Sequence, residues 1–164
     1  RLNLRALLDI SDELNVVCFS VILRPGKGLS DFLDLVKGYR DRNNYKFLLI
    51  GDGPERYLAE KYSYDNLVWT GRVTDVEKYL IMSDIYYFPS KIEMMPMALI
   101  EAINTGKKII AYPTEINNFL LNGETFENIT DTKILNRELP CGLNLKNYNL
   151  QYGIQQLHDL CFGC

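Results

Sequence analysis

The sequence predicts an α/β fold built on a Rossmann-like, doubly wound parallel sheet, and three observations point to it. Short apolar blocks alternate with longer stretches whose apolar residues recur at helical spacing. The short blocks are almost continuously apolar, which is typical of strands buried on both faces of a parallel sheet. Glycine, proline and asparagine separate the blocks. Strands and helices in this alternation form right-handed crossovers, which place helices on both faces of the sheet.

The first part of the pattern contains two strands and two helices. A strand is predicted from Asn15 to Ile22, followed by a turn at 25–28. Ser30 is expected to cap the next helix. The apolar face of that helix comprises Phe32, Leu35, Val36 and Tyr39. A second strand is predicted from Lys46 to Ile50, and the turn Gly51–Pro54 then opens a helix with proline at its first position.

The second part continues the alternation. It contains, in order, a strand at 67–69, a helix from about 74 to 82, a strand at 85–88, a helix from Pro96 to Gly106 and a strand at 108–112. The pattern fades after Gly123, where only an edge strand near Phe126 and a last helix from Leu150 are predicted.

Three regions are therefore expected along the chain. Residues 1–14 are a linker or a helical lead-in, residues 15–123 form the α/β core, and residues 124–164 are a poorly patterned C-terminal extension. Because the chain starts with Arg1 rather than Met, we expect it to be a piece of a longer protein.

Composition argues against several classes of function. The chain has 164 residues, of which 47% are hydrophobic and 24% charged, as in one soluble globular domain. Its net charge of −3 argues against a nucleic-acid partner, and no apolar run reaches the ~18 residues of a membrane span. Four cysteines are too few for a disulfide-built secreted domain, so a cytoplasmic location is predicted.

The usual catalytic and cofactor motifs are missing from the sequence. Cys161 and Cys164 form one C-x-x-C pair, which could hold zinc or carry redox chemistry but equally fits a frayed terminus. His158 is the only histidine, so no catalytic triad is expected. The motifs of P-loop nucleotidases and of dinucleotide-dependent dehydrogenases are absent. We therefore predict no cofactor and no metal site.

Ligands of open α/β sheets bind outside the carboxyl ends of the strands. That edge comprises the turns 23–29, 51–55, 71–75, 90–96 and 112–118. Gly28 and Gly53 allow close backbone approach there. Arg24, Lys27 and Arg72 add positive charge, so the edge predicts an anionic, phosphorylated ligand. The alternative is that these cations are ordinary surface charges and the glycines form plain connectors.

Glu101 is the only charged residue of an otherwise apolar segment, Met97 to Ile103, which is predicted to be a buried helix. A buried carboxylate is costly unless donors satisfy it. The small Ala98, one turn earlier, leaves room for a ligand, and the two neighbouring hydroxyls of a ribose could both donate to one carboxylate. Alternatively, Glu101 pairs with a structural lysine or arginine, or lies at an exposed edge.

The residues just before this helix predict a place for phosphate. Glu93 and the amides of Met94 and Met95 lie at the positive end of the helix, where free N–H groups favour an anion. Methionines are also common core filler, which is the alternative.

Five segments share their order and spacing with a known family. They are Lys27-Gly28, Ile50 to Glu55, Thr70 to Val73, Ser83 to Ser90, and Glu93 to Ala102 with Gly106. Together they resemble the C-terminal domain of the GT-B-fold, family-4 (group 1) retaining glycosyltransferases, whose E-x7-E signature corresponds to Glu93 and Glu101. The resemblance runs from about Val16 to Gly123 and implies the C-terminal half of a GT-B architecture, with 15–123 as the nucleotide-sugar donor-binding core.

This resemblance implies roles for the residues of the edge. The predicted catalytic residues are Glu93, which would face the donor sugar, and Lys27, which would neutralise the diphosphate. Glu101 would hold the ribose hydroxyls. The remaining substrate-binding residues are Arg24, Gly28, Gly53, Arg72, Val73, Met94, Met95, Pro96 and Met97; amides around Met95–Met97 would cap the diphosphate, and backbone near Arg72 and Val73 would hold the base.

The implied reaction is transfer of a hexose, with retention and without a metal, from a UDP-sugar to a glycan or lipid acceptor. The implied partner is an N-terminal acceptor domain of the same enzyme, without which the chain is inactive and through which the full-length enzyme could contact a membrane peripherally.

The sequence departs from the family at three places. Those at Ile22 and Met94 favour an alternative, a non-catalytic nucleotide-binding or scaffold module with a degenerate donor site, and the third bears on which sugar the donor carries. Val21-Ile22 stand where the family has Gly-Arg, although Arg24 could supply the charge. Met94 replaces a family glycine, and Thr114 to Asn117 replace a Gly-Gly pair.

Overall fold

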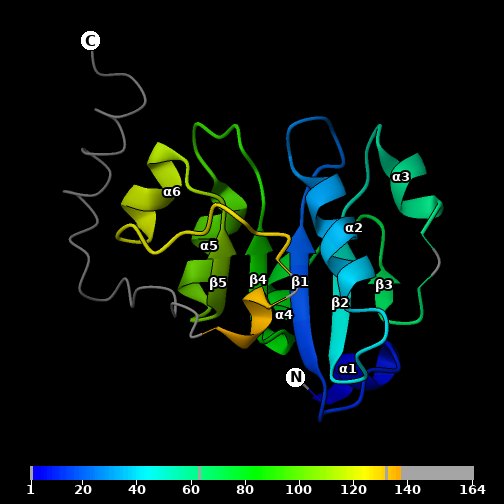
Figure 1. Cartoon of the computed structure of the whole chain (residues 1–164). Coiled ribbons are helices and arrows are strands. Elements are labelled where there is room, and N and C mark those ends of the chain that lie inside the picture. Colours follow the sequence, from blue (N-terminus) through cyan, green and yellow to red (C-terminus); the bar gives the residue numbers. More distant parts are fainter. Residues whose placement is uncertain (1, 63, 132, 138–164) are drawn as a thin grey trace.

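The computed structural model describes residues 2–62, 64–131 and 133–137. Cys161, Cys164, His158 and the helix expected from Leu150 lie outside the described residues. The strands of the described part form one parallel sheet in the order β3-β2-β1-β4-β5 (Figure 1). They are β1 (Asn15–Ser20), β2 (Tyr45–Ile50), β3 (Leu67–Trp69), β4 (Ile85–Phe88) and β5 (Lys108–Ala111). The predicted fold class is confirmed.

Helices follow the strands as the alternation predicts. They are α1 (Leu2–Leu7), α2 (Leu29–Gly38), α3 (Arg56–Glu60), α4 (Val76–Met82), α5 (Met97–Asn104), α6 (Glu115–Leu120) and the 3₁₀ helix η1 (Ile134–Asn136). None of the helices in this part of the chain combines the length and apolarity needed to cross a bilayer.

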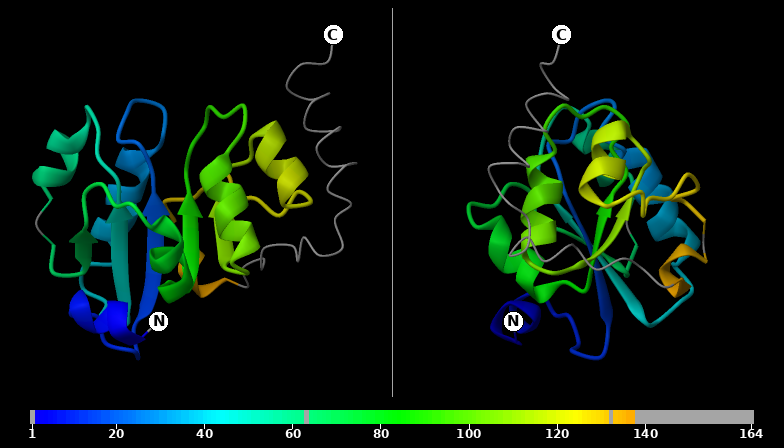
Figure 2. Two further views of the ribbon diagram at one scale, coloured as in Figure 1. Left: turned by 180° about the vertical axis from the view of Figure 1, so that it is seen from behind. Right: turned by 90° about the vertical axis from the view of Figure 1, so that its left-hand side faces the viewer.

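The helices lie on both faces of the sheet (Figure 2). α2 and α3 cover one face together with the segment around η1, whereas α1, α4 and α5 cover the other. β2 and then β3 follow on one side of β1 in the sheet. β4, the next strand along the chain, pairs with β1 on its other side. The boundary between β1 and β4 is therefore the topological switch point, where doubly wound folds bind their ligands.

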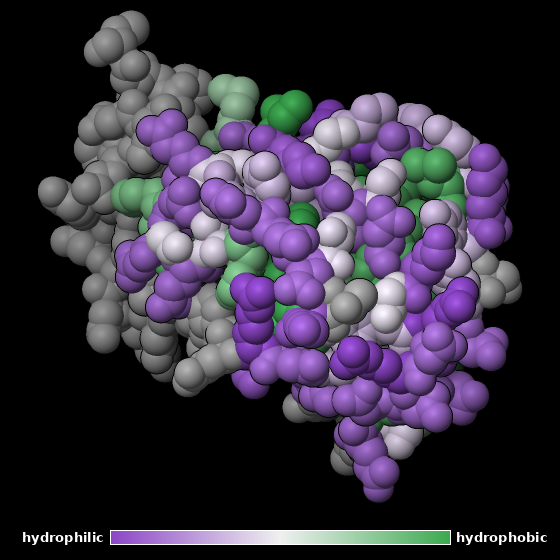
Figure 3. All heavy atoms as spheres, in the orientation of Figure 1, coloured by the Kyte–Doolittle hydropathy of each residue, from purple (hydrophilic) through white to green (hydrophobic). Residues whose placement is uncertain are grey.

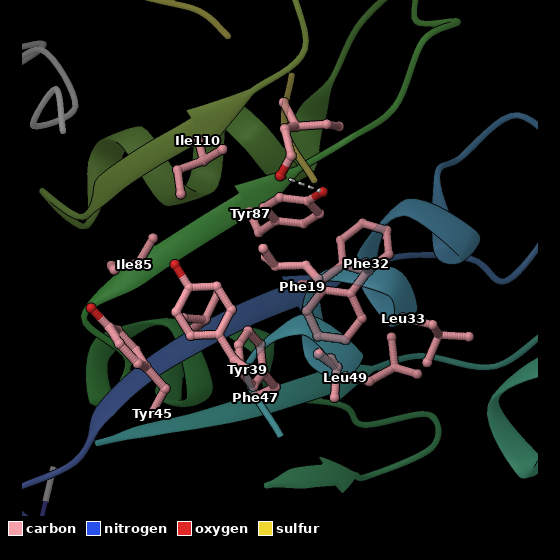
Figure 4. Packing of buried hydrophobic residues seen from close by; sticks show 14 of the residues in the cluster. Phe19, Phe32, Leu33, Tyr39, Tyr45, Phe47, Leu49, Ile85, Tyr87 and Ile110 are labelled. Atoms are coloured by element: carbon pink, nitrogen blue, oxygen red, sulfur yellow. Dashed lines mark hydrogen bonds between the residues drawn. The ribbon is translucent and has the colours of Figure 1, made fainter. Parts of the chain in front are cut away.

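An aromatic cluster fills the face under α2 (Figure 4). The rings of Phe19 and Phe32 lie with centroids 5.2 Å apart, and Tyr87 lies 5.8 Å from Phe32. The Tyr87 hydroxyl donates to the Ile129 carbonyl at 3.2 Å, which ties the chain after β5 to this core. Burial of each of these rings stabilises the fold by about 1.5–3 kcal/mol, so the sheet that carries the edge loops rests on a well-packed core.

The structure corrects several details of the predicted elements. The helix after the second strand, α3, begins at Arg56, so Pro54 precedes it and is not its first residue. Ser30 does not cap α2: Gly28 takes that position with φ +82°, and no side chain caps the helix. No strand forms near Phe126, whose amide makes a single bond to the Ala111 carbonyl at 2.9 Å. α6 occupies the turn expected after the fifth strand, because the Thr114 hydroxyl accepts from the Asn117 amide at 3.1 Å and caps it.

Strand β1 is shorter than predicted, since it ends at Ser20 rather than Ile22. The Val21 amide still donates to the Ile50 carbonyl at 2.9 Å. Ile22, however, belongs to the edge loop and is exposed, which leaves it available to a ligand.

Cys18 provides a chemical probe of the fold. It lies fully buried in β1, and burial raises the pKa of its thiol from 9.0 to about 12. Because the thiolate is the reactive form, Cys18 is expected to resist iodoacetamide at about pH 8 in the folded chain and to react readily after unfolding. Peptide mass spectrometry would locate the label. Native labelling of Cys18 as fast as in urea would contradict its burial.

Candidate functional site

The candidate site lies at the carboxyl ends of the strands, where the loops after β1 and β4 project side by side (top of Figure 1). A Cβ built on Gly28 would lie 2.6 Å from the Pro89 side chain, so these loops touch where only glycine fits. The Gly26 carbonyl accepts from the Ser90 hydroxyl at 3.5 Å and from the Lys91 amide at 3.4 Å. The two loops are therefore packed together at the switch point.

Lys27 and Glu93, the two predicted catalytic residues, form an ion pair across this junction. The Lys27 Nζ lies 2.7 Å from the Glu93 Oε1, with side chains only 15% and 10% exposed. Lys27 also lies 3.4 Å from the Ile92 carbonyl. The fold thus brings together two residues that are 66 positions apart, one from each loop.

Glu101 is exposed, which contradicts the predicted buried carboxylate. The helix α5 buries only the stripe Leu99, Ala102 and Ile103. Glu101 lies on the opposite stripe with Met97 and Asn104, so the apolar composition of the segment overstated its burial. The predicted burial of Glu101 is wrong because the apolar Met97, on the same stripe of α5, is itself exposed.

The exposed Glu101 nevertheless lines a hollow of about 440 Å³ between α4 and α5, here called the α4–α5 hollow. Its lining residues are Thr74, Asp75, Val76, Glu77, Leu80, Glu101, Asn104 and Thr105. All of these polar groups can form hydrogen bonds with the hydroxyls of a sugar, and the carboxylates repel a phosphate. Of these lining residues, only Glu101 is among the predicted site residues. Thr74 and Asp75 belong to the turn 71–75, which the sequence places at the ligand edge.

A second hollow, of about 560 Å³, lies over β1, β2 and β3 and is called the β1–β3 hollow. It is lined by Val21, Ile22, Gly51, Asp52, Gly53 and Arg72. The structure thus brings the predicted residues Gly53 and Arg72 together. Ile22, the residue at the position of the family's arginine, is 64% exposed in the same hollow.

A third hollow, of about 350 Å³, separates the loop after β4 from the start of α6 and is called the β4–α6 hollow. Its lining residues are Lys91, Ile92, Glu93, Met94, Thr114, Glu115 and Ile116. Glu93 therefore faces both Lys27 and this hollow. Glu115 and Ile116 are site residues that the sequence did not predict, because residues 112–118 lack the apolar periodicity that would indicate the helix α6.

The methionines before α5 are solvent-facing rather than core filler. Met94 and Met95 are exposed, as is Met97, whereas Pro96 is buried. Figure 3 shows apolar side chains at the top of the molecule, where these loops project. Pro96 has no N–H, and the Met97 amide donates to the Met95 carbonyl at 3.0 Å, so the predicted amide cap for a phosphate is not preformed.

The other predicted residues are distributed as follows. Arg24 is exposed in the loop after β1. Val73 is partly buried and packs against the face of the core that α4 and α5 cover. Within the described residues, no group of three or more His, Cys, Asp or Glu side chains has the arrangement of a metal site.

Comparisons with known proteins agree with this architecture. A family model described as "Glycosyl transferases group 1" matches residues 13–135. The lipopolysaccharide 1,2-N-acetylglucosaminetransferase of Salmonella typhimurium is 27% identical over 140 residues, covering 75% of this chain and 37% of that protein. The UDP-Gal:alpha-D-GlcNAc-diphosphoundecaprenol alpha-1,3-galactosyltransferase of Escherichia coli is 30% identical over 139 residues, covering 70% and 36%. The chain thus spans little more than a third of these relatives.

Solved structures share the fold. WaaG, a glycosyltransferase involved in lipopolysaccharide biosynthesis, superposes with a TM-score of 0.70 at 18% identity, covering 100% of this chain and 51% of that one. Anabaena Alr3699/HepE in complex with UDP-glucose gives 0.70 at 19% identity, covering 96% and 50%. This sheet and its helices therefore share the fold of about half of each of these proteins.

Proposed function

The chain belongs to the group 1 glycosyltransferases, and from this membership we propose that it is the donor-binding domain of a retaining hexosyltransferase that uses a UDP-sugar. The relatives support a UDP donor, since one is named for UDP-Gal and a structural neighbour binds UDP-glucose. Their names also support a glycan or lipid-linked acceptor.

The observation that carries this proposal is the α4–α5 hollow, where Glu101 lies with two other carboxylates, two threonine hydroxyls and an asparagine amide, next to the loop after β3. We assign the ribose to Glu101 and the base to the backbone near Arg72 and Val73. The diphosphate then reaches Lys27 at the switch point, and the sugar enters the β4–α6 hollow beside Glu93. The ribose, the diphosphate and the sugar therefore each meet side chains that suit them, and the base meets backbone.

In the proposed mechanism the protein acts mainly through charge. The bond between the anomeric carbon of the sugar and the diphosphate breaks, the acceptor hydroxyl bonds to that carbon and gives up its proton, and negative charge builds up on the departing UDP. Lys27, with Arg24 or Arg72 nearby on the same edge, stabilises that charge without a metal. Glu93 orients the sugar.

The whole enzyme requires more than this chain. We propose that an N-terminal half supplies the acceptor site and the remaining catalytic groups, so that this chain binds donor but transfers no sugar alone. That half would also make any peripheral membrane contact of a cytoplasmic enzyme. Sugar transfer by the chain alone would contradict this part of the proposal.

Replacing Glu101 tests the donor site. Glu101→Ala is expected to weaken UDP binding about tenfold, because two hydroxyl-to-carboxylate hydrogen bonds are lost. Titration calorimetry with UDP and with 2′,3′-dideoxy-UDP separates the ribose contacts from all others. The wild type should prefer UDP, whereas the variant should bind both equally.

The control for this experiment is Glu13→Ala, which removes an exposed carboxylate in the loop before β1 at the opposite edge of the sheet. It should leave both affinities unchanged. An undiminished preference for UDP in Glu101→Ala would remove Glu101 from the ribose site.

A second candidate function has a specific observation in its favour. Ile22 and Met94 are 64% and 67% exposed at the positions where the family has arginine and glycine. An apolar side chain at each place weakens a phosphate site, as expected of a non-catalytic module with a degenerate donor site. Calorimetry with UDP and UDP-glucose decides: a scaffold module would bind neither, and a non-catalytic nucleotide-binding module would bind UDP without gaining affinity from the sugar.

A further inference from the structure

The Lys27–Glu93 ion pair joins two residues that are proposed to bind different parts of the donor. Lys27 serves the diphosphate and Glu93 serves the sugar, yet here each neutralises the other at 2.7 Å. We propose that Glu93 is the counter-ion of Lys27 only until donor binds, and that the diphosphate displaces it and thereby frees Glu93 for the sugar. This inference rests on the proposed function.

The pair is not needed to hold its two loops together. Gly28 already packs on Pro89, and the Gly26 carbonyl accepts from the Ser90 hydroxyl and the Lys91 amide. These contacts are backbone and short side-chain interactions that persist when the ion pair opens. Lys27 and Glu93 are therefore able to exchange partners without unfolding the junction.

Charge favours the exchange. Glu93 offers Lys27 one negative charge, whereas a nucleoside diphosphate offers two or more, spread over several acceptor oxygens. Both side chains are largely shielded from water, so an unpaired lysine would be costly there and a new anion must replace the old one. The Glu93 carboxylate therefore competes with the diphosphate for Lys27 until the carboxylate is displaced.

The released carboxylate has a place to act. Glu93 lines the β4–α6 hollow with Lys91, Thr114 and Glu115. Lys91 is already 3.2 Å from Asp31, so it is a weaker competitor for Glu93 than sugar hydroxyls would be. Diphosphate binding and sugar recognition are thereby coupled through one side chain, and the sugar is engaged only after the diphosphate.

The test is the variant Glu93→Gln, which keeps the shape of the side chain and removes its charge. If Glu93 competes with the diphosphate, UDP binding by the variant should tighten about three- to tenfold. Uridine, which has no phosphate, should bind as in the wild type. The extra affinity of UDP-glucose or UDP-galactose over UDP should fall, because a neutral amide forms weaker hydrogen bonds with the sugar hydroxyls than a carboxylate does.

Three comparisons complete the design. Glu13→Gln makes the same change of charge at the opposite edge and should leave UDP affinity unchanged. Lys27→Met should weaken UDP binding and leave uridine binding unaltered. Glu93→Gln and Lys27→Met each leave a shielded charge unpaired, so their thermal midpoints should fall. Each variant should still unfold in one cooperative transition above the temperature of the titrations, which excludes loss of fold as the cause.

The outcomes separate this inference from the function on which it rests. Weaker or unchanged UDP binding in Glu93→Gln would overturn the exchange, since Glu93 would then position Lys27 or not compete at all, while the donor site would stand. Failure of the wild-type chain to bind UDP would overturn both.

Discussion

Replacing Arg5 with alanine is expected to lower the free energy of unfolding by about 3–5 kcal/mol, because it leaves a buried network without its donor. Arg5 is 1% exposed. Its guanidinium bonds the Met82 carbonyl through Nε at 3.1 Å and Nη2 at 2.9 Å, and Nη2 lies 2.7 Å from an Asp84 carboxylate oxygen. The same oxygen accepts from the Val16 amide at 2.9 Å, so losing Arg5 also disturbs an acceptor on which β1 depends.

Urea unfolding followed by circular dichroism measures this effect. Arg40→Ala, which removes an exposed arginine paired with Asp41, is the matched control and should leave the midpoint unchanged. Arg5→Lys should be destabilised as well, since an ammonium group cannot form the fork to both acceptors. A stability loss as small as that of Arg40→Ala would mean that α1 is dispensable and that the folding unit begins near residue 15.

The strands could be predicted because their signal is local. Blocks such as Phe47 to Ile50 are apolar without interruption and end at glycine or proline, so both their type and their order follow from sequence. The ligand edge followed from the same pattern, since parallel strands end together. Lys27 and Glu93 were placed on that edge correctly, and their approach to 2.7 Å depends on the β1–β4 neighbourhood.

The features that could not be predicted depend on tertiary contacts. Arg5 looks like a surface residue of a lead-in helix, because its partners Met82 and Asp84 are nearly 80 positions away. The exposure of Glu101 depends on which stripe of α5 meets the sheet, and an apolar segment of eight residues does not specify that stripe. α6 was missed because its cap, Thr114, precedes a segment with little apolar periodicity.

Gly51→Ala is expected to abolish stable folding of the ligand edge, with a loss above about 4 kcal/mol from a left-handed backbone and a direct clash. Gly51 has φ +129°, and a Cβ there would lie 1.8 Å from the Val21 carbonyl oxygen. The neighbour is backbone of the loop after β1, which cannot move without breaking the bond from the Val21 amide to Ile50.

Trp69, the only tryptophan, reports this change directly. Its Nε1 donates to the Gly51 carbonyl at 2.9 Å, and the Gly51 amide donates to Gly71 at 2.8 Å. Displacing Gly51 should therefore shift the Trp69 emission to the red and lower the urea midpoint of the same signal.

Gly106→Ala separates the cost of the left-handed backbone from the cost of the clash. Gly106 has φ +67°, but no atom lies within 4 Å of the added Cβ. It should lose only about 1–2 kcal/mol for the left-handed backbone. If Gly51→Ala lost no more than this control, the loops after β1 and β2 would have to separate at little cost. The β1–β3 hollow would then be adjustable, and Arg72 would not be held at a fixed place beside Ile22.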